Sequence, residues 1–147
     1  MPVYVDVGRC VACHGCEMAC SVSHQGRSGV FVQVVDDLVG VSMICRHCQD
    51  APCIRVCYAG ALQQEGTEVV LDETLCTGCG LCQAACPFGL ISGGTRPFKC
   101  DLCPGLQTPL CVTTCPSGAL SDGPFQAVAG HFRALAAQKL ARSGVRR

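Results

Sequence analysis

The fold is decided by the stretch Cys76-Thr77-Gly78-Cys79-Gly80-Leu81-Cys82-Gln83-Ala84-Ala85-Cys86-Pro87. Its cysteines follow the spacing C-x2-C-x2-C-x3-C, and a proline comes directly after them. Three thiolates at this spacing can wrap a tight loop around one face of an inorganic cubane, and the small residues between them let backbone N–H groups turn toward the sulfurs. The fourth cysteine starts a helical turn and points away from the loop, and the proline ends that turn.

The other cysteines repeat this spacing with small variations, so that four groups of four leave no cysteine over. The repeat extends beyond sulfur, because residues 58–62, 88–91 and 117–120 each follow a group and read as a turn leading into a short strand. The groups are Cys10, Cys13, Cys16 and Cys20; Cys45, Cys48, Cys53 and Cys57; Cys76, Cys79, Cys82 and Cys86; and Cys100, Cys103, Cys111 and Cys115.

The composition excludes several classes of protein. Cysteine supplies 16 of 147 residues, above the roughly 8–10 % at which it becomes a class signal, while aromatic residues make up only 5 %. Lys plus Arg equals Asp plus Glu at 11 each, so no basic excess suggests nucleic acid as a partner. No window approaches the roughly 20 apolar residues of a membrane span, and residues 1–6 lack the pattern of a secretory signal.

Three chemistries use cysteines at high density. A disulfide scaffold has no reason to repeat one spacing four times, and a chain without a secretory signal favours metal binding and a cytoplasmic location. Structural zinc uses paired C-x2-C knuckles, which fit the second and fourth groups but not the first and third. Four [4Fe–4S] clusters use every thiolate. We therefore expect iron through all sixteen cysteines. Export in complex with a partner that carries a signal stays open.

The cysteine order resembles the four-cluster ferredoxin-type electron-transfer subunits of molybdenum and tungsten oxidoreductases (aldehyde oxidoreductase, formate dehydrogenase and DMSO reductase types) and of hydrogenase and carbon monoxide dehydrogenase systems. The likeness spans residues 3–122. It includes Cys-x-x-Cys-His14-x-Cys-Glu17-x-x-Cys-Ser21-x-x-His24, Cys-Arg46-His47-Cys-x-x-Ala-Pro52-Cys, and Lys99-Cys-Asp101-x-Cys.

The resemblance implies an α+β fold of two bacterial-type ferredoxin modules, each with two [4Fe–4S] clusters, nested so that the first and fourth groups share a module. The outer, discontinuous module would take residues 1–43 and 92–123, the inner, continuous one residues 44–91, and a C-terminal helix or tail residues 124–147. The implied ligand sets are Cys10, Cys13, Cys16 and Cys115 (cluster 1); Cys20, Cys100, Cys103 and Cys111 (cluster 2); Cys45, Cys48, Cys53 and Cys86 (cluster 3); and Cys57, Cys76, Cys79 and Cys82 (cluster 4).

Four residues near the cysteines leave alternatives open. Tyr58 stands after Cys57, where the family often has proline, so its N–H either approaches a sulfur or the residue simply packs. His14 and His47 lie between ligands and either contact a cluster or face solvent. By resemblance alone, His47 could instead face a cofactor of the partner, and Lys99 could lie near a cluster or face the partner's pterin.

The rest of the chain supplies short elements. Residues 30–35 and 39–44 predict a hairpin across Asp36-Asp37, and residues 67–72 an arm that turns at Glu65-Gly66. Short helices are expected after Cys16, Cys53 and Cys82, the last over residues 81–85. Apolar spacing predicts a helix over residues 125–142, which packs on its own module, docks on another subunit or binds a membrane surface.

Nothing in the sequence indicates catalysis. A Ser/His/Asp arrangement, a phosphate-cradling loop and an open metal position are all missing, so we expect a non-catalytic electron-transfer subunit. It would relay single electrons between a tungsten or molybdenum pterin catalytic subunit, of the aldehyde or formate oxidation class, and a second redox partner such as a flavin subunit or ferredoxin. The alternatives are a relay subunit of a hydrogenase or carbon monoxide dehydrogenase, a free-standing polyferredoxin, an iron–sulfur regulator, and self-assembly into a longer wire.

Overall fold

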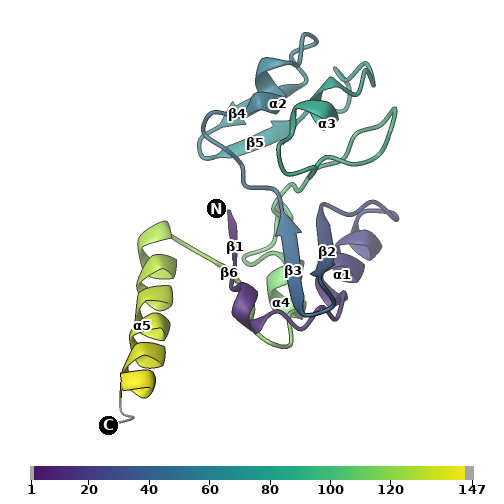
Figure 1. The fold of residues 1–147 in the computed structure, drawn as a ribbon. Helices are drawn as coiled ribbons and strands as arrows, with labels where there is room; N and C mark the ends of the chain where they lie inside the picture. The colour runs from purple at the N-terminus through teal and green to yellow at the C-terminus, as the bar shows by residue number, and fades with distance from the viewer. Residues whose placement is uncertain (1, 145–147) are drawn as a thin grey trace.

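The computed structural model describes residues 2–144, which form two lobes and a separate C-terminal helix (Figure 1). The upper lobe holds α2, α3, β4 and β5, and the lower lobe holds the remaining strands with α1 and α4. The elements are β1 (Val3–Val5), the short 3-10 helix Val7–Arg9, α1 (Gly15–Ser23), β2 (Val30–Val35), β3 (Val39–Ile44), α2 (Pro52–Arg55), β4 (Leu62–Glu65), β5 (Glu68–Leu71), α3 (Leu81–Ala85), α4 (Leu110–Thr114), β6 (Leu120–Asp122) and α5 (Phe125–Gly144).

The longest sheet is the hairpin of β2 and β3, which pair antiparallel from Val30 opposite Ile44 to Val35 opposite Val39. Both aspartates of the connecting turn are left-handed, with φ of 51° at Asp36 and 54° at Asp37. Asparagine and aspartate tolerate this region better than most residues, and a turn with two such residues matches the twist of a hairpin. The predicted hairpin and its bounds are confirmed.

The other two sheets pair β4 with β5 and β1 with β6, both antiparallel. The strands expected after the second and fourth cysteine groups are present as β4 and β6. The strand expected within residues 88–91 is wrong, because the Leu90 N–H donates to Cys86 Sγ at 3.4 Å instead of to a neighbouring strand. Only an isolated bridge between Ser92 and Phe98 follows.

Two separate cores hold the lobes, and the mixture of helix and strand is the expected α+β class. One core draws on both ends of the chain, and the other on a continuous stretch of it; the predicted boundaries at 43/44 and 91/92 stay predictions. Arg27 and Glu73 form an ion pair of 2.8 Å between the lobes. The lower core comprises Val3, Cys16, Cys20, Val30, Val32, Ile44, Phe98, Cys100, Leu102, Cys111 and Leu120, and the upper core Ala51, Leu62, Val69, Cys82 and Ile91.

Helix α5 is attached loosely compared with the other elements. Val128 is its one buried residue within the described range, while Phe125 and Leu140 are 64 % and 71 % exposed. The Phe125 ring lies 6.3 Å from that of Tyr4, between ring centroids. The predicted helix is confirmed, and whether it also docks on a partner stays a prediction. Met1 and residues 145–147, which belong to the predicted outer module and tail, lie outside the described residues.

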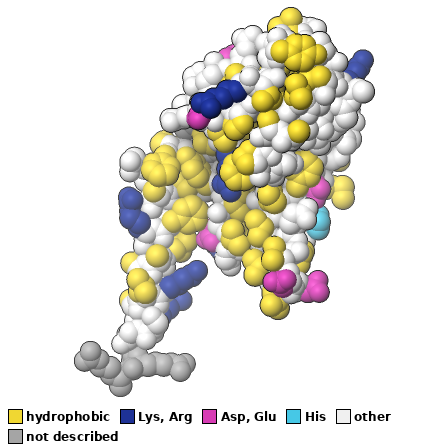
Figure 2. Space-filling view, turned by 45° about the horizontal axis from the view of Figure 1, so that its top comes forward, with side chains coloured by type: hydrophobic (Ala, Val, Ile, Leu, Met, Phe, Trp, Pro, Cys, Tyr) yellow, Lys and Arg dark blue, Asp and Glu magenta, His cyan; other side chains and the backbone are white. Residues whose placement is uncertain are grey.

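Exposed apolar side chains cover parts of the upper lobe and of α5 (Figure 2). On the upper lobe the large ones include Tyr58, Leu81 and Phe88, which are 70 %, 47 % and 44 % exposed. Among the helices of residues 2–144, none has the length and hydropathy that crossing a bilayer requires.

Replacing Gly29 with alanine should destabilise the lower lobe, because a Cβ there would lie 2.6 Å from the backbone nitrogen of Cys100. Overpacking of this kind costs about 1–3 kcal/mol of unfolding free energy. Gly130→Ala is the matched control: its Cβ meets nothing closer than 4.0 Å, and alanine favours the helix by about 0.5–1 kcal/mol. Thermal unfolding under anaerobic conditions should lower the midpoint for the first variant only. Equal midpoints would show that the Cys100 loop can move away.

Candidate metal centres

The four cysteine groups share one backbone feature. The residue directly before the second cysteine is left-handed in every group, with φ of 51° at Ala12, 45° at His47, 71° at Gly78 and 60° at Leu102. A left-handed residue in such a loop turns successive N–H groups inward and forms a concavity that attracts negative charge. Three of the four are not glycine and carry strain of about 1–3 kcal/mol each, which a structure keeps where the loop geometry is needed.

Three cavities are each lined by four cysteines, and each takes three of them from one sequence group and one from another. The first has three cysteines of the first group and one of the fourth; the second and third combine the two middle groups in the same way. Their cysteines are Cys10, Cys13, Cys16 and Cys115; Cys45, Cys48, Cys53 and Cys86; and Cys57, Cys76, Cys79 and Cys82.

The four remaining cysteines lie within electrostatic reach of one another. Burial raises the pKa of the Cys111 thiol to about 12, and the nearby Cys100, Cys103 and Cys20 add to the rise. Burial likewise raises the pKa of Cys100 to about 12. Such thiols are protonated without metal, so iron must displace their protons to bind.

Backbone amides reach two of the sulfurs directly. The Gly29 N–H donates to Cys20 Sγ at 3.3 Å, and the Leu90 N–H donates to Cys86 Sγ at 3.4 Å. Hydrogen bonds to a thiolate stabilise its charge. These donors fit a negatively charged iron–sulfur group better than free thiols.

Hydrogen bonds also stabilise the thiolate of Cys115, as the pKa of this residue shows. Burial raises the pKa of this thiol, but the Ser117 hydroxyl and the backbone amides of Leu120, Ala119 and Ser117 together outweigh burial and lower it. The turn after the last cysteine group therefore favours a thiolate at this position. The donor set of the chain, thiolates supported by N–H and O–H groups, fits [4Fe–4S] clusters.

Tyr58 does not direct its amide at a sulfur. The Tyr58 N–H donates to the Val56 carbonyl oxygen at 3.1 Å, and its hydroxyl lies 2.9 Å from Thr77 Oγ1 in the loop of the third group. The alternative in which the missing proline adds a donor to a cluster is therefore wrong for this residue. The side chain is mostly exposed, and its hydroxyl contacts the neighbouring loop.

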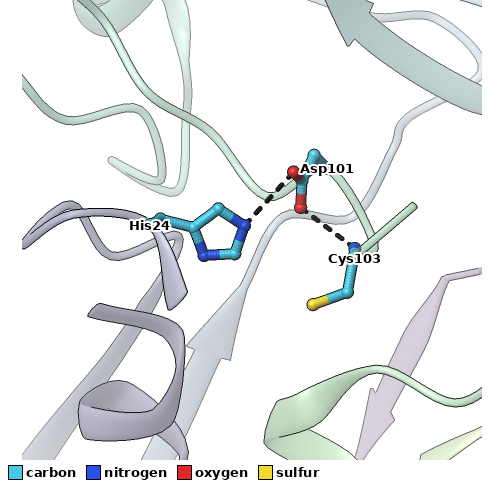
Figure 3. A group of neighbouring side chains, drawn as sticks. All are labelled: His24, Asp101 and Cys103. Atoms are coloured by element: carbon cyan, nitrogen blue, oxygen red, sulfur yellow. Dashed lines mark hydrogen bonds and ion pairs between the residues drawn. The ribbon is translucent and has the colours of Figure 1, made fainter. Parts of the chain in front are cut away.

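His24, Asp101 and Cys103 present three possible ligand atoms within 4.8 Å of one another (Figure 3). One Asp101 oxygen lies 3.2 Å from His24 Nε2, and the other accepts the Cys103 N–H at 3.0 Å. The carboxylate thus ties the end of α1 to the loop that carries Cys103. Because Cys103 belongs to the cysteines already gathered around Cys111, we interpret this cluster as a support for that loop.

The two histidines between cysteines differ in environment. His14 is exposed and bonds Glu17 at 2.8 Å. His47 is 5 % exposed, accepts the Val69 N–H on Nδ1 at 3.0 Å, and leaves Nε2 without a hydrogen-bond partner among residues 2–144. Burial and then the nearby Lys99 lower the pKa of His47 to about 4, so it is neutral near pH 7. Lys99 is 3 % exposed. Burial contradicts the alternative in which His47 faces solvent, and a position of His47 or Lys99 near a partner's cofactor stays a prediction.

Two cysteines stand out by exposure. Cys13 in the lower lobe and Cys79 in the upper lobe are exposed, whereas the other fourteen are buried or partly buried. They line two different cavities of the three described above. The cysteine sites therefore approach solvent at two separate places.

Comparison with known proteins yields relatives that are named as iron–sulfur or electron transport proteins. The family model of the 4Fe-4S dicluster domain matches residues 36–124. The chain is 31 % identical to an iron-sulfur protein of Rhodospirillum rubrum, over 96 % of this chain and 91 % of that one. It is 32 % identical to the electron transport protein HydN of Escherichia coli, over 80 % and 85 %. The formate dehydrogenase iron-sulfur subunit of Wolinella succinogenes is 40 % identical over 69 % of this chain and 60 % of that one.

Among solved structures, the chain aligns with one from the active site complex BamBC of benzoyl coenzyme A reductase. The identity is 26 %, the alignment covers 99 % of this chain and 96 % of that one, and the TM-score is 0.48.

Proposed function

Because the chain belongs to the 4Fe-4S dicluster domain family, and because its sixteen cysteines fit four [4Fe–4S] clusters, we propose that it is the electron-transfer subunit of an oxidoreductase complex, relaying single electrons through four clusters. Bound clusters supply one-electron chemistry. The chain's own part is to hold them with thiolates, to direct amides at the sulfurs and to exclude water.

One observation carries this proposal: the three cavities that each combine three cysteines of one group with one of another. In the bacterial two-cluster pattern the fourth cysteine of a run ligates the other cluster, which produces such sharing. We propose the cavity cysteines as the ligands of clusters 1, 3 and 4. Cluster 2 is then held by Cys20, Cys100, Cys103 and Cys111.

We infer the order of the relay from which ligand sets lie close together. A charge on Cys16 of the first set raises the pKa of Cys111 in the second set, and a charge on Cys45 of the third set raises the pKa of Cys100 in the second set. The third and fourth sets share α2 and its end, through Cys53 and Cys57. Because the exposed Cys13 and Cys79 belong to the first and fourth sets, we infer that electrons enter and leave at those two ends.

We propose a tungsten or molybdenum pterin catalytic subunit at one end and a flavin subunit or ferredoxin at the other, in the cytoplasm. The similarity to a formate dehydrogenase iron-sulfur subunit supports a partner of the formate or aldehyde oxidation class. Exposed apolar residues of α5, such as Phe125 and Leu140, offer a surface on which one of these subunits can dock.

The test is anaerobic purification of the tagged full chain from its native host, with the metals and flavin of the complex quantified. We expect about sixteen iron atoms per chain, together with a second polypeptide that carries tungsten or molybdenum. A variant that lacks residues 125–147 should keep its iron and lose partner binding if α5 is the docking element. Nickel in the co-purified subunit would replace the proposal by a hydrogenase or carbon monoxide dehydrogenase relay. A solitary iron-loaded monomer would replace it by a free carrier.

A further inference from the structure

Lys99 is a buried cation with unusual partners. Its side chain is 3 % exposed, and the Nζ ammonium donates to two backbone carbonyl oxygens, that of Cys100 at 2.6 Å and that of Val69. Both acceptors are neutral. The ion pairs among residues 2–144 do not include Lys99. A charge buried in this way needs compensation by an opposite charge nearby.

The cavity beside Lys99 is lined by the carboxylates of Glu65, Glu68, Glu73 and Asp101, none of which forms an ion pair with it among residues 2–144. Cysteines of two different ligand sets also lie near the ammonium. Burial raises the pKa of the Cys45 thiol, and the Lys99 charge is the largest influence that opposes the rise. The same charge lowers the pKa of Cys53, against the larger effects of burial and of Cys45. It also acts on Cys100, against burial. The hydrogen bonds of Lys99 place the ammonium between the two sets: Cys100 belongs to the second set, and Val69 lines the cavity of the third set together with Cys45 and Cys53.

A [4Fe–4S] cluster with four thiolate ligands carries a formal charge of about −2 when oxidised and becomes more negative on reduction. Two such groups beside Lys99 would compensate the ammonium, whose two hydrogen-bond acceptors are neutral carbonyl groups. A fixed positive charge in turn favours the reduced, more negative state of each cluster.

We propose that Lys99 is the shared counter-ion of clusters 2 and 3 and raises the reduction potential of this central pair relative to the two terminal clusters. The inference rests on the proposed function, because it needs the four ligand sets. The same charge lessens the repulsion between the two central clusters when an electron occupies either one, which keeps the middle of the relay accessible from both ends.

A structural role must be separated from this electrostatic one. Lys99 connects the two lobes, because it comes from the segment before Cys100 and bonds Val69 on β5, whose N–H also bonds His47. Lys99→Arg keeps the charge, whereas Lys99→Gln removes it and keeps an N–H donor for the carbonyl oxygens. The chain also provides a control, since Lys139 on α5 is its only other lysine and is exposed.

The experiment is a redox titration of the anaerobically purified full chain, followed by electron paramagnetic resonance, in the wild type and in Lys99→Gln, Lys99→Arg and Lys139→Gln. Iron is counted first. In Lys99→Gln we expect two of the four midpoint potentials to shift to more negative values while two stay unchanged. Lys99→Arg should restore most of the shift, and Lys139→Gln should leave all four potentials as in the wild type.

The possible outcomes distinguish a failure of the proposed function from a failure of the counter-ion role. A wild type with fewer than four clusters contradicts the proposed function itself. Four clusters with unchanged potentials in Lys99→Gln, or an equal shift of all four, overturn only the counter-ion role. Should Lys99→Gln fail to load, Lys99→Met and Lys99→Arg are compared for iron uptake: loading of Lys99→Met equal to that of Lys99→Arg contradicts the proposal, and loading of Lys99→Arg alone supports it.

Discussion

Removal of iron from the anaerobically purified chain is expected to unfold both lobes. The aliphatic cores are small, and five of their sixteen buried members are cysteines. Burial raises the pKa of Cys100 and Cys111 to about 12, so in the iron-free chain these positions hold buried neutral thiols. For small metal-dependent folds the binding free energy of the metal is the folding free energy, about 10–16 kcal/mol for structural zinc. The binding free energy of four clusters therefore far exceeds the roughly 5–15 kcal/mol by which an ordinary domain is stable against unfolding.

The measurement is far-UV circular dichroism together with amide exchange, before and after the iron is chelated under oxidising conditions. The Val69 N–H is a useful reporter, because it is buried and bonded to His47 in the loop of the second group. It should exchange slowly in the loaded chain and rapidly after iron removal. Return of protection on reconstitution with iron and sulfide is the control for chemical damage. An iron-free chain that keeps the Val69 amide protected would mean that the aliphatic cores suffice.

The elements that the sequence predicted correctly carry strong local signals. The β2–β3 hairpin combines a β-branched run with Asp36-Asp37, two residues that tolerate a left-handed turn, and α3 follows the third cysteine group as expected. The pairing of β1 with β6 was not predicted, because strands of three residues from opposite ends of the chain contain too few positions for a periodic pattern. Helix α4 was also missed; it begins at the end of the seven-residue spacer between Cys103 and Cys111, which the other groups lack.

Some features of the candidate site were also predictable from the sequence, and others were not. The cysteines were identifiable because their spacing repeats. The left-handed backbone at Ala12, His47 and Leu102 was not, since alanine and leucine disfavour it and a single histidine does not specify it. The burial of Lys99 also depends on tertiary structure, because the carbonyl of Val69 reaches it only when β5 lies against the segment before Cys100. Sequence reasoning therefore identified the ligands and, by resemblance, offered Lys99 near a cluster, but it could not show that this lysine is buried against β5.

The assignment of cysteines to clusters makes a prediction that distinguishes it from the simplest alternative. If every contiguous group held its own cluster, Cys79 and Cys86 would serve the same cluster and Cys57 another. The proposed sharing reverses this, since Cys57 lines the cavity of Cys79, and Cys86 lines that of Cys45, Cys48 and Cys53. All three of Cys57, Cys79 and Cys86 are exposed or only partly buried, so alanine at these positions removes no fully buried side chain.

Two double variants should therefore differ in the number of intact clusters. Cys57→Ala with Cys79→Ala removes two ligands of one site and should leave three [4Fe–4S] clusters, or about twelve iron atoms in them. Cys79→Ala with Cys86→Ala removes one ligand from each of two sites and should leave two, or about eight iron atoms. Mössbauer spectroscopy of chains loaded with 57Fe counts intact clusters separately from three-iron remnants, and each single variant should show three. The opposite order of the two doubles would mean that each group binds its own cluster, and the ligand sets, the order of the relay and the position of Lys99 between two clusters would all have to be abandoned.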